Sequence, residues 1–388
     1  MVPPVTRKTI LVVFLIVGVC LSLTPFGFAR DLNTIRVAVL RDAVMARLSI
    51  DGFYRIEDVP AHKILSTGKN LRGAATAFKY AVAIGGRRYT QKELFLNIDD
   101  PGALQVNGRR YHGSLAITRI RNAMTLINYV DLEDYIKGIA VREISHYWPA
   151  EALKAQAIVF RTYALYSMKQ NASRDFDVTS DVYSQVYGGT SAQRYRITDV
   201  IDETAGDVLT YQGKIFPAFY HSTCGGNTED AKALWDVDLP VLKGVACGYC
   251  AGSPHYSWKA AIPLAALAAK LRKAGVKVPS VRRIEISDID PSGRVTDIEI
   301  SGPDEERIKV SAKDFRNIMG PDLVKSARFT LAMRGNAIEL SGTGWGHGVG
   351  LCQWGAYFMA KAGYSAAEIL GFYYPGSKVM NIHTQKVY

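Results

Sequence analysis

The sequence predicts an α+β fold, in which mixed and antiparallel sheets and several helices form a cleft. Short β-type runs alternate with turn residues from Thr34 to Asn128. A helical periodicity then extends from Asp131 to Asn171, and strands interspersed with helices return beyond Val208. Because strands and helices come in blocks, the pattern differs from the regular strand–helix alternation of a parallel α/β fold.

The length and composition indicate more than one structural part. The chain has 388 residues, of which 48% are apolar and 21% charged, as in ordinary globular proteins. A typical domain has roughly 100–200 residues. We predict a signal peptide or N-terminal anchor at residues 1–29, a β-rich region at residues 30–120 and a larger domain at residues 121–388.

The N-terminus has the pattern of an export signal. Arg7 and Lys8 precede an uncharged apolar run, and Gly27 and Ala29 supply the small residues that a signal peptidase reads, which predicts cleavage after Ala29. The alternative is a retained anchor, since residues 9–29 carry no charge and about 20 residues span a bilayer. Either reading predicts export to the periplasm or cell wall, with membrane contact only if the segment is retained.

The formal net charge is +11, and it falls to +9 if Arg7 and Lys8 leave with the signal. A nucleic-acid-binding protein would have this sign. However, the sequence has no Gly-Phe-rich RNA-binding motif and no zinc-finger spacing, and it carries an export signal. We therefore expect no nucleic-acid partner. An exported basic protein is better suited to an anionic cell envelope.

The first β-type runs are predicted to form antiparallel strands and hairpins. They are "IRVAVL", "FKYAVAIGG", "ALQVNGRRYHGSLAI" and "AMTLINYV". Within the third run, Asn107-Gly108 is a favourable pair for a tight hairpin turn. Later strands are expected in "VLTYQGKIFPAFYHS", "RVTDIEIS", "FTLAM" and "AIELSG", with helices near 262–274, 312–319 and 351–362 and a final helix opened by a Ser365–Glu368 capping box.

The first predicted helix carries the candidate catalytic acid. Asp131 is a suitable N-cap, and the apolar residues after it form one stripe. Successive residues turn by about 100°, so Glu143 projects from this stripe, whereas Glu133 and Asp134 are expected to face water. Burial would raise the pKa of Glu143 and suit it to general acid catalysis. The alternative is an acid at a helix end that turns out to solvent.

The second helix is predicted to begin at Pro149. Its buried stripe is expected to contain Leu153, Ala157, Phe160, Ala164 and Met168. Arg161 lies about 60° from the centre of the stripe, at the edge of burial. It is predicted either to face the same cleft as Glu143 or to extend along the helix into solvent.

Three blocks of the chain resemble the signature blocks of the stage II sporulation protein D family, which includes the amidase-enhancer proteins. The blocks are "EDYIKGIAVREISHYWPAEALKAQAIVFRTYAL", "AFYHSTCGGNTED" and "GWGHGVGLCQWGAYFMAKAGYSAAEILGFYYPGSKV". The resemblance covers about residues 120–380. It implies that residues 121–388 form a lytic transglycosylase domain, which cuts peptidoglycan glycan strands after an amidase has removed their stem peptides. The family's catalytic glutamate falls on Glu143, and the arginine of its "RTYA" helix falls on Arg161.

The sequence offers one convincing catalytic acid, and the implied reaction needs only one. Glycoside hydrolases normally use two carboxyl groups. A lytic transglycosylase needs one, which protonates the glycosidic oxygen and then accepts the proton of the muramic acid 6-hydroxyl, so that 1,6-anhydro-muramic acid forms. Arg161 and Tyr256 would orient the sugar, although Tyr256 also suits simple packing. The alternative function is a non-catalytic enhancer that binds and stimulates a partner cell-wall amidase.

Four residues have the spacing of a zinc site: His221, Cys224, Cys247 and Cys250. Together they would fill a tetrahedron and leave no position for a catalytic water, so the predicted zinc is structural and the chemistry needs no cofactor. Export equally favours a disulfide from Cys224 to Cys247 or Cys250. Free thiols are the third possibility.

The stretch "GTGWGHGVGLCQWGA" combines glycines with aromatic residues. Glycines allow a backbone to approach a polysaccharide closely, and Trp345 and Trp354 offer flat faces for sugars. His347 is predicted to hydrogen bond to Glu143 or the substrate, or else to hold a tight structural loop. By resemblance the block belongs to the active-site cleft, so Gln353 is also assigned to substrate binding. Cys352 is expected to be a core residue.

Overall fold

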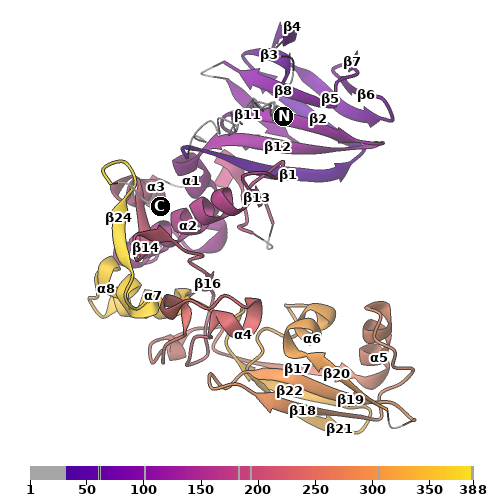
Figure 1. The fold of residues 1–388 in the computed structure, drawn as a ribbon, viewed down its shortest axis with the longest axis vertical. Coiled ribbons are helices and arrows are strands. Elements are labelled where there is room, and N and C mark those ends of the chain that lie inside the picture. The colour runs from indigo at the N-terminus through magenta and orange to yellow at the C-terminus, as the bar shows by residue number, and fades with distance from the viewer. Residues whose placement is uncertain are drawn as a thin grey trace, which may run out of the picture. The chain divides into compact units, whose positions relative to one another are not determined.

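The computed structural model describes residues 32–385, except 60, 62, 100, 101, 182, 183, 193, 194 and 305 (Figure 1). The predicted signal peptide at residues 1–29 therefore lies outside the described residues. Among the helices that are described, none combines the length and the apolar character needed to cross a membrane.

Between residues 32 and 131, the described part of the chain forms twelve strands, which agrees with the predicted alternation of strands and turns. They are β1 (Thr34–Ala43), β2 (Met45–Asp51), β3 (Phe53–Asp58), β4 (Lys63–Lys69), β5 (Arg72–Phe78), β6 (Ala81–Ile84), β7 (Arg87–Tyr89), β8 (Glu93–Ile98), β9 (Ala103–Val106), β10 (Arg109–Tyr111), β11 (Ser114–Ile120) and β12 (Ala123–Asp131). With β13 (Val178–Thr179) they form a seven-stranded sheet, β13-β1-β12-β11-β8-β3-β4, and a six-stranded sheet, β10-β9-β2-β5-β6-β7.

The two sheets share one hydrophobic core. Alternate residues of β2, such as Ala46, Leu48 and Ile50, are buried in the same cluster as Ile35 and Val37 of β1. The turn between β9 and β10 is the predicted Asn107-Gly108 pair, whose φ angles of 51° and 84° suit a tight hairpin.

The predicted division at residue 120 falls between two neighbouring strands. β11 and β12 pair from Ser114↔Tyr129 to Ile120↔Ala123. The first helices also contribute to the core that the sheets share. The β-rich N-terminal part and the helices that follow it are therefore built around one core.

Helix α1 (Leu132–Glu143) and helix α2 (Ala150–Gln170) agree with the predicted periodicity, and α3 (Tyr195–Glu203) follows them. The Asp131 side chain accepts hydrogen bonds from the backbone N–H groups of Glu133 and Asp134, which confirms the predicted N-cap. The predicted stripe of α2 packs into the core of the sheets, while its Ala155 and Val159 pack into a second core. Both sides of α2 are therefore buried.

The second core lies around the C-terminal helices. Its elements are β14 (Asp207–Tyr211), β16 (Tyr220–His221), α4 (Ala231–Trp235), β23 (Leu351–Cys352), α7 (Gln353–Lys361) and α8 (Ala366–Tyr373). The strands β15 (Lys214–Ile215) and β24 (Lys378–Asn381) flank β14 in a three-stranded sheet. Short β16 and β23 run parallel and pair Tyr220 with Leu351 and His221 with Cys352. The predicted Ser365–Glu368 capping box opens α8.

Residues 257–343 contain a third core of their own. Its elements are β17 (Ser257–Pro263), α5 (Leu264–Lys273), β18 (Arg283–Ile289), β19 (Val295–Ser301), β20 (Arg307–Ser311), α6 (Ala312–Met319), β21 (Phe329–Arg334) and β22 (Ala337–Thr343). They form the sheets β17-β22-β21 and β18-β19-β20. The predicted α+β class, with mixed and antiparallel sheets, is confirmed.

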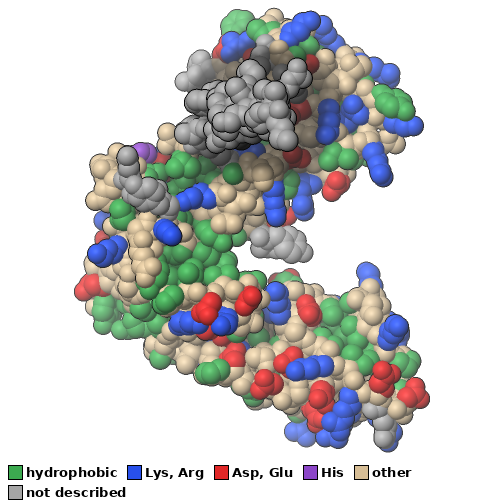
Figure 2. All heavy atoms as spheres, in the orientation of Figure 1, with side chains coloured by type: hydrophobic (Ala, Val, Ile, Leu, Met, Phe, Trp, Pro, Cys, Tyr) green, Lys and Arg blue, Asp and Glu red, His purple; other side chains and the backbone are tan. Residues whose placement is uncertain are grey.

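Positive charge is concentrated in the β-rich N-terminal part. Residues 32–131 contain fifteen Lys or Arg and eight Asp or Glu residues. Figure 2 shows many Lys and Arg side chains on this part of the visible surface, whereas acidic and basic side chains mix over the elements β17–β22. Most of the net charge therefore comes from the N-terminal sheets.

Candidate active site and metal centre

Glu143 is the last residue of α1 and lines a pocket. Its Oε1 atom accepts a hydrogen bond of 2.9 Å from the backbone N–H of Val186. The Tyr220 hydroxyl makes a second hydrogen bond to the same carboxyl group. Two donors from distant parts of the chain therefore fix the side chain, which excludes the alternative of an acid turned freely to solvent.

Burial raises the pKa of Glu143, and the hydrogen bonds from Val186 and Tyr220 oppose that rise in part. The net rise increases the fraction of the carboxyl group that holds a proton near neutral pH. Such a group can donate a proton to a substrate oxygen and accept one back. The environment of Glu143 therefore suits a general acid and base.

A chain of buried hydrogen bonds holds Tyr220, which in turn binds Glu143. The Tyr135 hydroxyl donates to Gln185 Oε1 at 3.1 Å, and the Gln185 side chain also hydrogen bonds to Tyr220. Burial, followed by the charge of Glu143, keeps the pKa of Tyr220 well above its ordinary value. Tyr220 therefore stays protonated and remains a donor to Glu143.

Sequence reasoning missed Gln185, Val186 and Tyr220. The sequence contained a signal for two of them, Gln185 in "SQVYGG" and Tyr220 in "AFYHS". A Gln or Tyr between apolar neighbours usually needs a buried hydrogen-bond partner. Which partner each finds depends on contacts between distant segments. The Val186–Glu143 bond joins residues 43 positions apart.

The pocket beside Glu143 has a volume of about 310 Å³. It is lined by Val141, Arg142, Glu143, Ile144, Ser145, Trp148, Ser222, His255, Gln353 and Trp354. The rings of Trp148 and Trp354 lie 5.1 Å apart. Glu143 is the single acid among these described lining residues, and it shares the pocket with the two tryptophans.

Gln353 lies in this pocket, where the sequence interpretation placed it. The residue is 6% exposed, and its Nε2 atom has no acceptor among the residues that the structure describes. A buried amide donor without an acceptor costs about 1–3 kcal/mol. The structure therefore holds an unpaired buried donor at the edge of this pocket.

Arg161 does not face the pocket. Its side chain is fully buried, and its Nε and Nη2 atoms each bind a carboxylate oxygen of Glu133 at 2.7 Å. Its Nη1 atom also donates to the Asp207 carbonyl at 2.8 Å. The expected positions of Arg161 at the edge of burial and of Glu133 in water are both wrong, because α2 is buried on two sides and Glu133 turns toward it.

This placement predicts that Arg161→Lys lowers stability and leaves turnover nearly unchanged. The ammonium group cannot reproduce the bidentate contact with Glu133, so we expect a stability loss of about 2–4 kcal/mol and little change in turnover per folded molecule. Thermal melts and single-turnover rates of this variant measure the two effects, with the exposed Arg174→Lys as control. A large loss of turnover at unchanged stability would contradict the structural role.

His347 holds the glycine-rich loop and does not contact Glu143 in any hydrogen bond of the described residues. Its Nδ1 atom accepts the Val349 N–H at 3.1 Å, and its ring also hydrogen bonds to the Tyr220 backbone. Burial, with a contribution from the charge of Arg316, lowers the pKa of His347 to about 3, so the ring is neutral. His347 positions the backbone of Tyr220, the residue that binds Glu143.

The glycines of the loop serve close packing within the protein. A Cβ atom on Gly350, where φ is +71°, would lie 2.0 Å from the Phe219 carbonyl oxygen. A Cβ atom on Gly348, where φ is +91°, would lie 2.5 Å from the Arg294 guanidinium. The structure thus explains these two glycines by contact with other segments of the chain, where the sequence interpretation invoked close approach to a polysaccharide.

Trp345 and Tyr256 lie beside the pocket and are not part of its lining. Lys325 Nζ lies 4.5 Å from the centre of the Trp345 ring, and the His255 ring packs edge-on against Trp345 at 4.8 Å. Tyr256 packs against the second core. The pocket-lining residue of "SPHYSW" is His255, one position before the predicted Tyr256.

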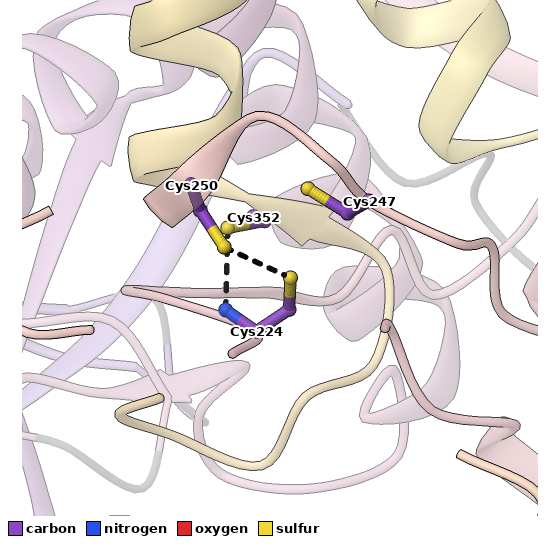
Figure 3. Close-up of side chains that lie close together, drawn as sticks. All are labelled: Cys224, Cys247, Cys250 and Cys352. Atoms are coloured by element: carbon purple, nitrogen blue, oxygen red, sulfur yellow. Dashed lines mark hydrogen bonds between the residues drawn. The ribbon is translucent and has the colours of Figure 1, made fainter. Parts of the chain in front are cut away.

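The cysteines form a buried cluster whose membership differs from the predicted one. The Sγ atoms of Cys224, Cys247, Cys250 and Cys352 all lie within 4.8 Å of one another (Figure 3). His221 is outside this group of atoms, and its Nδ1 atom hydrogen bonds to the Val349 carbonyl at 3.0 Å. Cys352 supplies the fourth thiol. It is fully buried in the second core, as expected, but its place in the thiol cluster was not predicted.

The four thiols fit a tetrahedral metal ion. A zinc ion with Zn–S bonds of about 2.3 Å separates its sulfur ligands by about 3.8 Å, which agrees with this spacing. Backbone N–H groups of Gly226 and Gly355 donate to the sulfur atoms of Cys224 and Cys352, at 3.4 and 3.3 Å, and such donors stabilise thiolates. All four cysteines are free, and the Cys224–Cys250 sulfur separation of 3.4 Å exceeds a disulfide bond.

The thiol cluster is linked to the pocket through short segments. Tyr220 and Ser222 precede Cys224, and Gln353 follows Cys352 directly. The parallel pairing of β16 with β23 holds these segments side by side. A metal ion bound by the thiols would therefore fix the residues that support Glu143 and line the pocket.

Comparisons with known proteins identify the family. A family model described as stage II sporulation protein matches residues 120–211, and a model described as a domain of unknown function matches residues 246–350. Stage II sporulation protein D of Bacillus subtilis is 31% identical over 281 residues, which are 68% of this chain and 79% of that protein. The chain belongs to the stage II sporulation protein D family, as the three blocks predict.

Two other relatives are similar over much of the chain. An uncharacterized protein of Brachyspira hyodysenteriae is 38% identical over 277 residues, which are 71% of this chain and 74% of that protein. The amidase enhancer of Bacillus subtilis is 28% identical over 289 residues, 62% of this chain and 40% of that protein. The similarity thus extends to the amidase-enhancer branch of the family.

Proposed function

We propose that this protein is a peptidoglycan lytic transglycosylase that cleaves peptide-free glycan strands, with Glu143 as its acid and base. The observation that carries the proposal is the single carboxyl group with a raised pKa in a pocket lined by two tryptophans. A hydrolase with two catalytic carboxyl groups would require a second acid in this lining. Membership of the stage II sporulation protein D family supports the same reaction.

The proposed reaction needs two proton transfers, one from Glu143 and one back to it. Protonated Glu143 donates to the oxygen between muramic acid and the next sugar, and the bond from that oxygen to C1 breaks. The 6-hydroxyl oxygen of the same muramic acid then bonds to C1 and gives its proton to the Glu143 carboxylate. The acid is regenerated, no water is consumed, and the new chain end is 1,6-anhydro-muramic acid.

Other lining residues would hold the sugar. Trp148 and Trp354 offer faces on which sugar rings stack, and Gln353 lines the same pocket. The Val186 N–H and the Tyr220 hydroxyl stabilise the carboxylate that remains after the first proton transfer. These groups stay in place through both steps, because backbone and buried contacts fix them.

We further propose that the four cysteines hold one structural zinc ion, which would have no open position for water and no part in the reaction. We also propose that the protein is exported, in line with the sequence of residues 1–29. Its substrate would then be produced by a cell-wall amidase, and the relative named amidase enhancer supports such a partner.

A comparison of two substrates tests the proposed function. Purified protein is incubated with peptide-free glycan and with intact peptidoglycan at equal glycan concentration, and 1,6-anhydro ends are counted by mass spectrometry. We expect cleavage of the peptide-free strand only. Equal cleavage of both would contradict the peptide-free specificity. No cleavage of either, together with faster turnover by an added cell-wall amidase, would support the alternative of a non-catalytic enhancer.

A further inference from the structure

Arg142 is the one charged group of the pocket whose charge no described residue neutralises. It precedes Glu143 in α1, lines the same pocket and is exposed. It makes no hydrogen bond or ion pair with any residue that the structure describes. An arginine left unpaired at a binding pocket can bind an anionic group of a ligand.

No hydrogen bond or ion pair joins Arg142 to the catalytic carboxyl group among the described residues. The causes that set the pKa of Glu143 are burial, Val186 and Tyr220, and Arg142 is not among them. A cation against Glu143 would lower its pKa and deprotonate the acid. The arrangement therefore gives the pocket a positive charge while Glu143 keeps its proton.

The second titratable base of the lining is His255. Burial and the charge of Lys325 lower its pKa, so His255 is neutral near pH 7. Arg142 is thus the one permanent cation among the described residues that line the pocket. An anion that enters the pocket would find its partner there.

The proposed substrate carries such an anion. An amidase adds water across the amide bond between the lactyl group of muramic acid and the stem peptide, and a lactyl carboxylate remains. This carboxylate is attached at C3 of the ring whose C1 takes part in the cleaved bond. With the stem peptide in place, the same position is an uncharged amide. Peptide-free and peptide-bearing strands therefore differ in charge beside the scissile bond.

We propose that Arg142 binds the lactyl carboxylate of peptide-free muramic acid and so makes the pocket selective for glycan that an amidase has already processed. The planar guanidinium can form two parallel hydrogen bonds to one carboxylate. This inference rests on the proposed function. It adds a chemical reason for substrate choice, namely the charge of the lactyl group, that is separate from the bulk of the stem peptide.

The test removes the charge and adds far less bulk than a stem peptide. Peptide-free glycan is converted with methylamine and a carbodiimide so that each lactyl carboxylate becomes a methyl amide. We expect kcat/KM of the wild-type protein to fall about 10- to 100-fold on the capped strand, since a hydrogen bond to a charged group contributes about 1.5–3 kcal/mol. The kcat/KM of Arg142→Gln on the uncapped strand should be lower than that of wild type by a similar factor, and this variant should cleave both strands equally. The matched control Arg174→Gln, an exposed arginine outside the pocket, should behave as wild type.

Two outcomes would overturn the inference. They are equal cleavage of capped and uncapped glycan by the wild-type protein, and undiminished discrimination by Arg142→Gln. Activity of Arg142→Gln on the capped strand, equal to that of wild type, confirms that the variant is folded. Glycan binding to Glu143→Gln and to the Glu143→Gln/Arg142→Gln double variant, measured by calorimetry, gives the same comparison without turnover. It separates failure of this inference from failure of the proposed function.

Discussion

Glu143→Gln is expected to reduce cleavage of peptide-free glycan by at least about 10³-fold, because the amide can neither donate nor recover the proton. The amide oxygen can still accept the hydrogen bonds of Val186 and Tyr220, so the fold should be kept. Release of anhydro-muramyl products at equal protein concentration measures the effect. The matched control is Glu339→Gln, an exposed acid of β22. Activity within about tenfold of wild type would show that Glu143 is not the essential acid.

The raised pKa of Glu143 also predicts a pH dependence. In the folded state this pKa lies above its unfolded value, so the native protein binds more protons between the two values and stability falls as pH rises through the folded pKa. The stability of Glu143→Gln does not fall in this way, because glutamine does not titrate. The melting temperature of the variant should therefore match or exceed that of wild type at neutral pH, and the difference should shrink in acid. A variant that melts lower at every pH would contradict a carboxyl group destabilised by burial.

Cys352→Ser is expected to lose the bound zinc. The free energy of unfolding should fall by at least about 4 kcal/mol, a loss that is exceptional for one substitution and that a lost metal site explains. Cys352 also caps α7, since its side chain accepts the Gly355 N–H. Serine is a good N-cap, so the substitution keeps the cap and removes the thiolate ligand. Metal analysis after purification under reducing conditions gives the zinc content, and thermal melts give the stability.

The variant to compare with Cys352→Ser is His221→Gln. The sequence interpretation made His221 the fourth ligand, whereas the structure places Cys352 in that position. We expect one zinc per chain in wild type and in His221→Gln, and none in Cys352→Ser. Zinc loss in His221→Gln with retention in Cys352→Ser would restore the predicted ligand set. A disulfide-linked peptide containing Cys224 and no zinc would favour the covalent alternative.

The features that could be predicted from the sequence depend on neighbouring residues. The Asp131 N-cap, the Asn107-Gly108 turn and the Ser365–Glu368 capping box each involve groups within a few positions. The projection of Glu143 from the buried stripe of α1 follows from helical periodicity alone. In each case the local geometry of one element decides the outcome.

The features that were predicted wrongly depend on contacts between distant segments. Arg161 was placed by its angle on one helix face, but a second core covers the other side of α2. Cys352 was separated from the other thiols by its position in the chain, yet it accepts a hydrogen bond from the backbone of Cys224, 128 residues away. The pairing of β16 with β23 brings these segments together. Strands of two residues are too short to be recognised from a periodic pattern in the sequence.

The central claim is a transglycosylation by a single acid, and the fate of water tests it most directly. Peptide-free glycan is cleaved in water enriched in oxygen-18, and the new chain ends are analysed by mass spectrometry. We predict 1,6-anhydro-muramic acid ends that carry no solvent oxygen, at a rate that depends on Glu143. Reducing ends that contain one solvent oxygen each would show hydrolysis and would contradict the account.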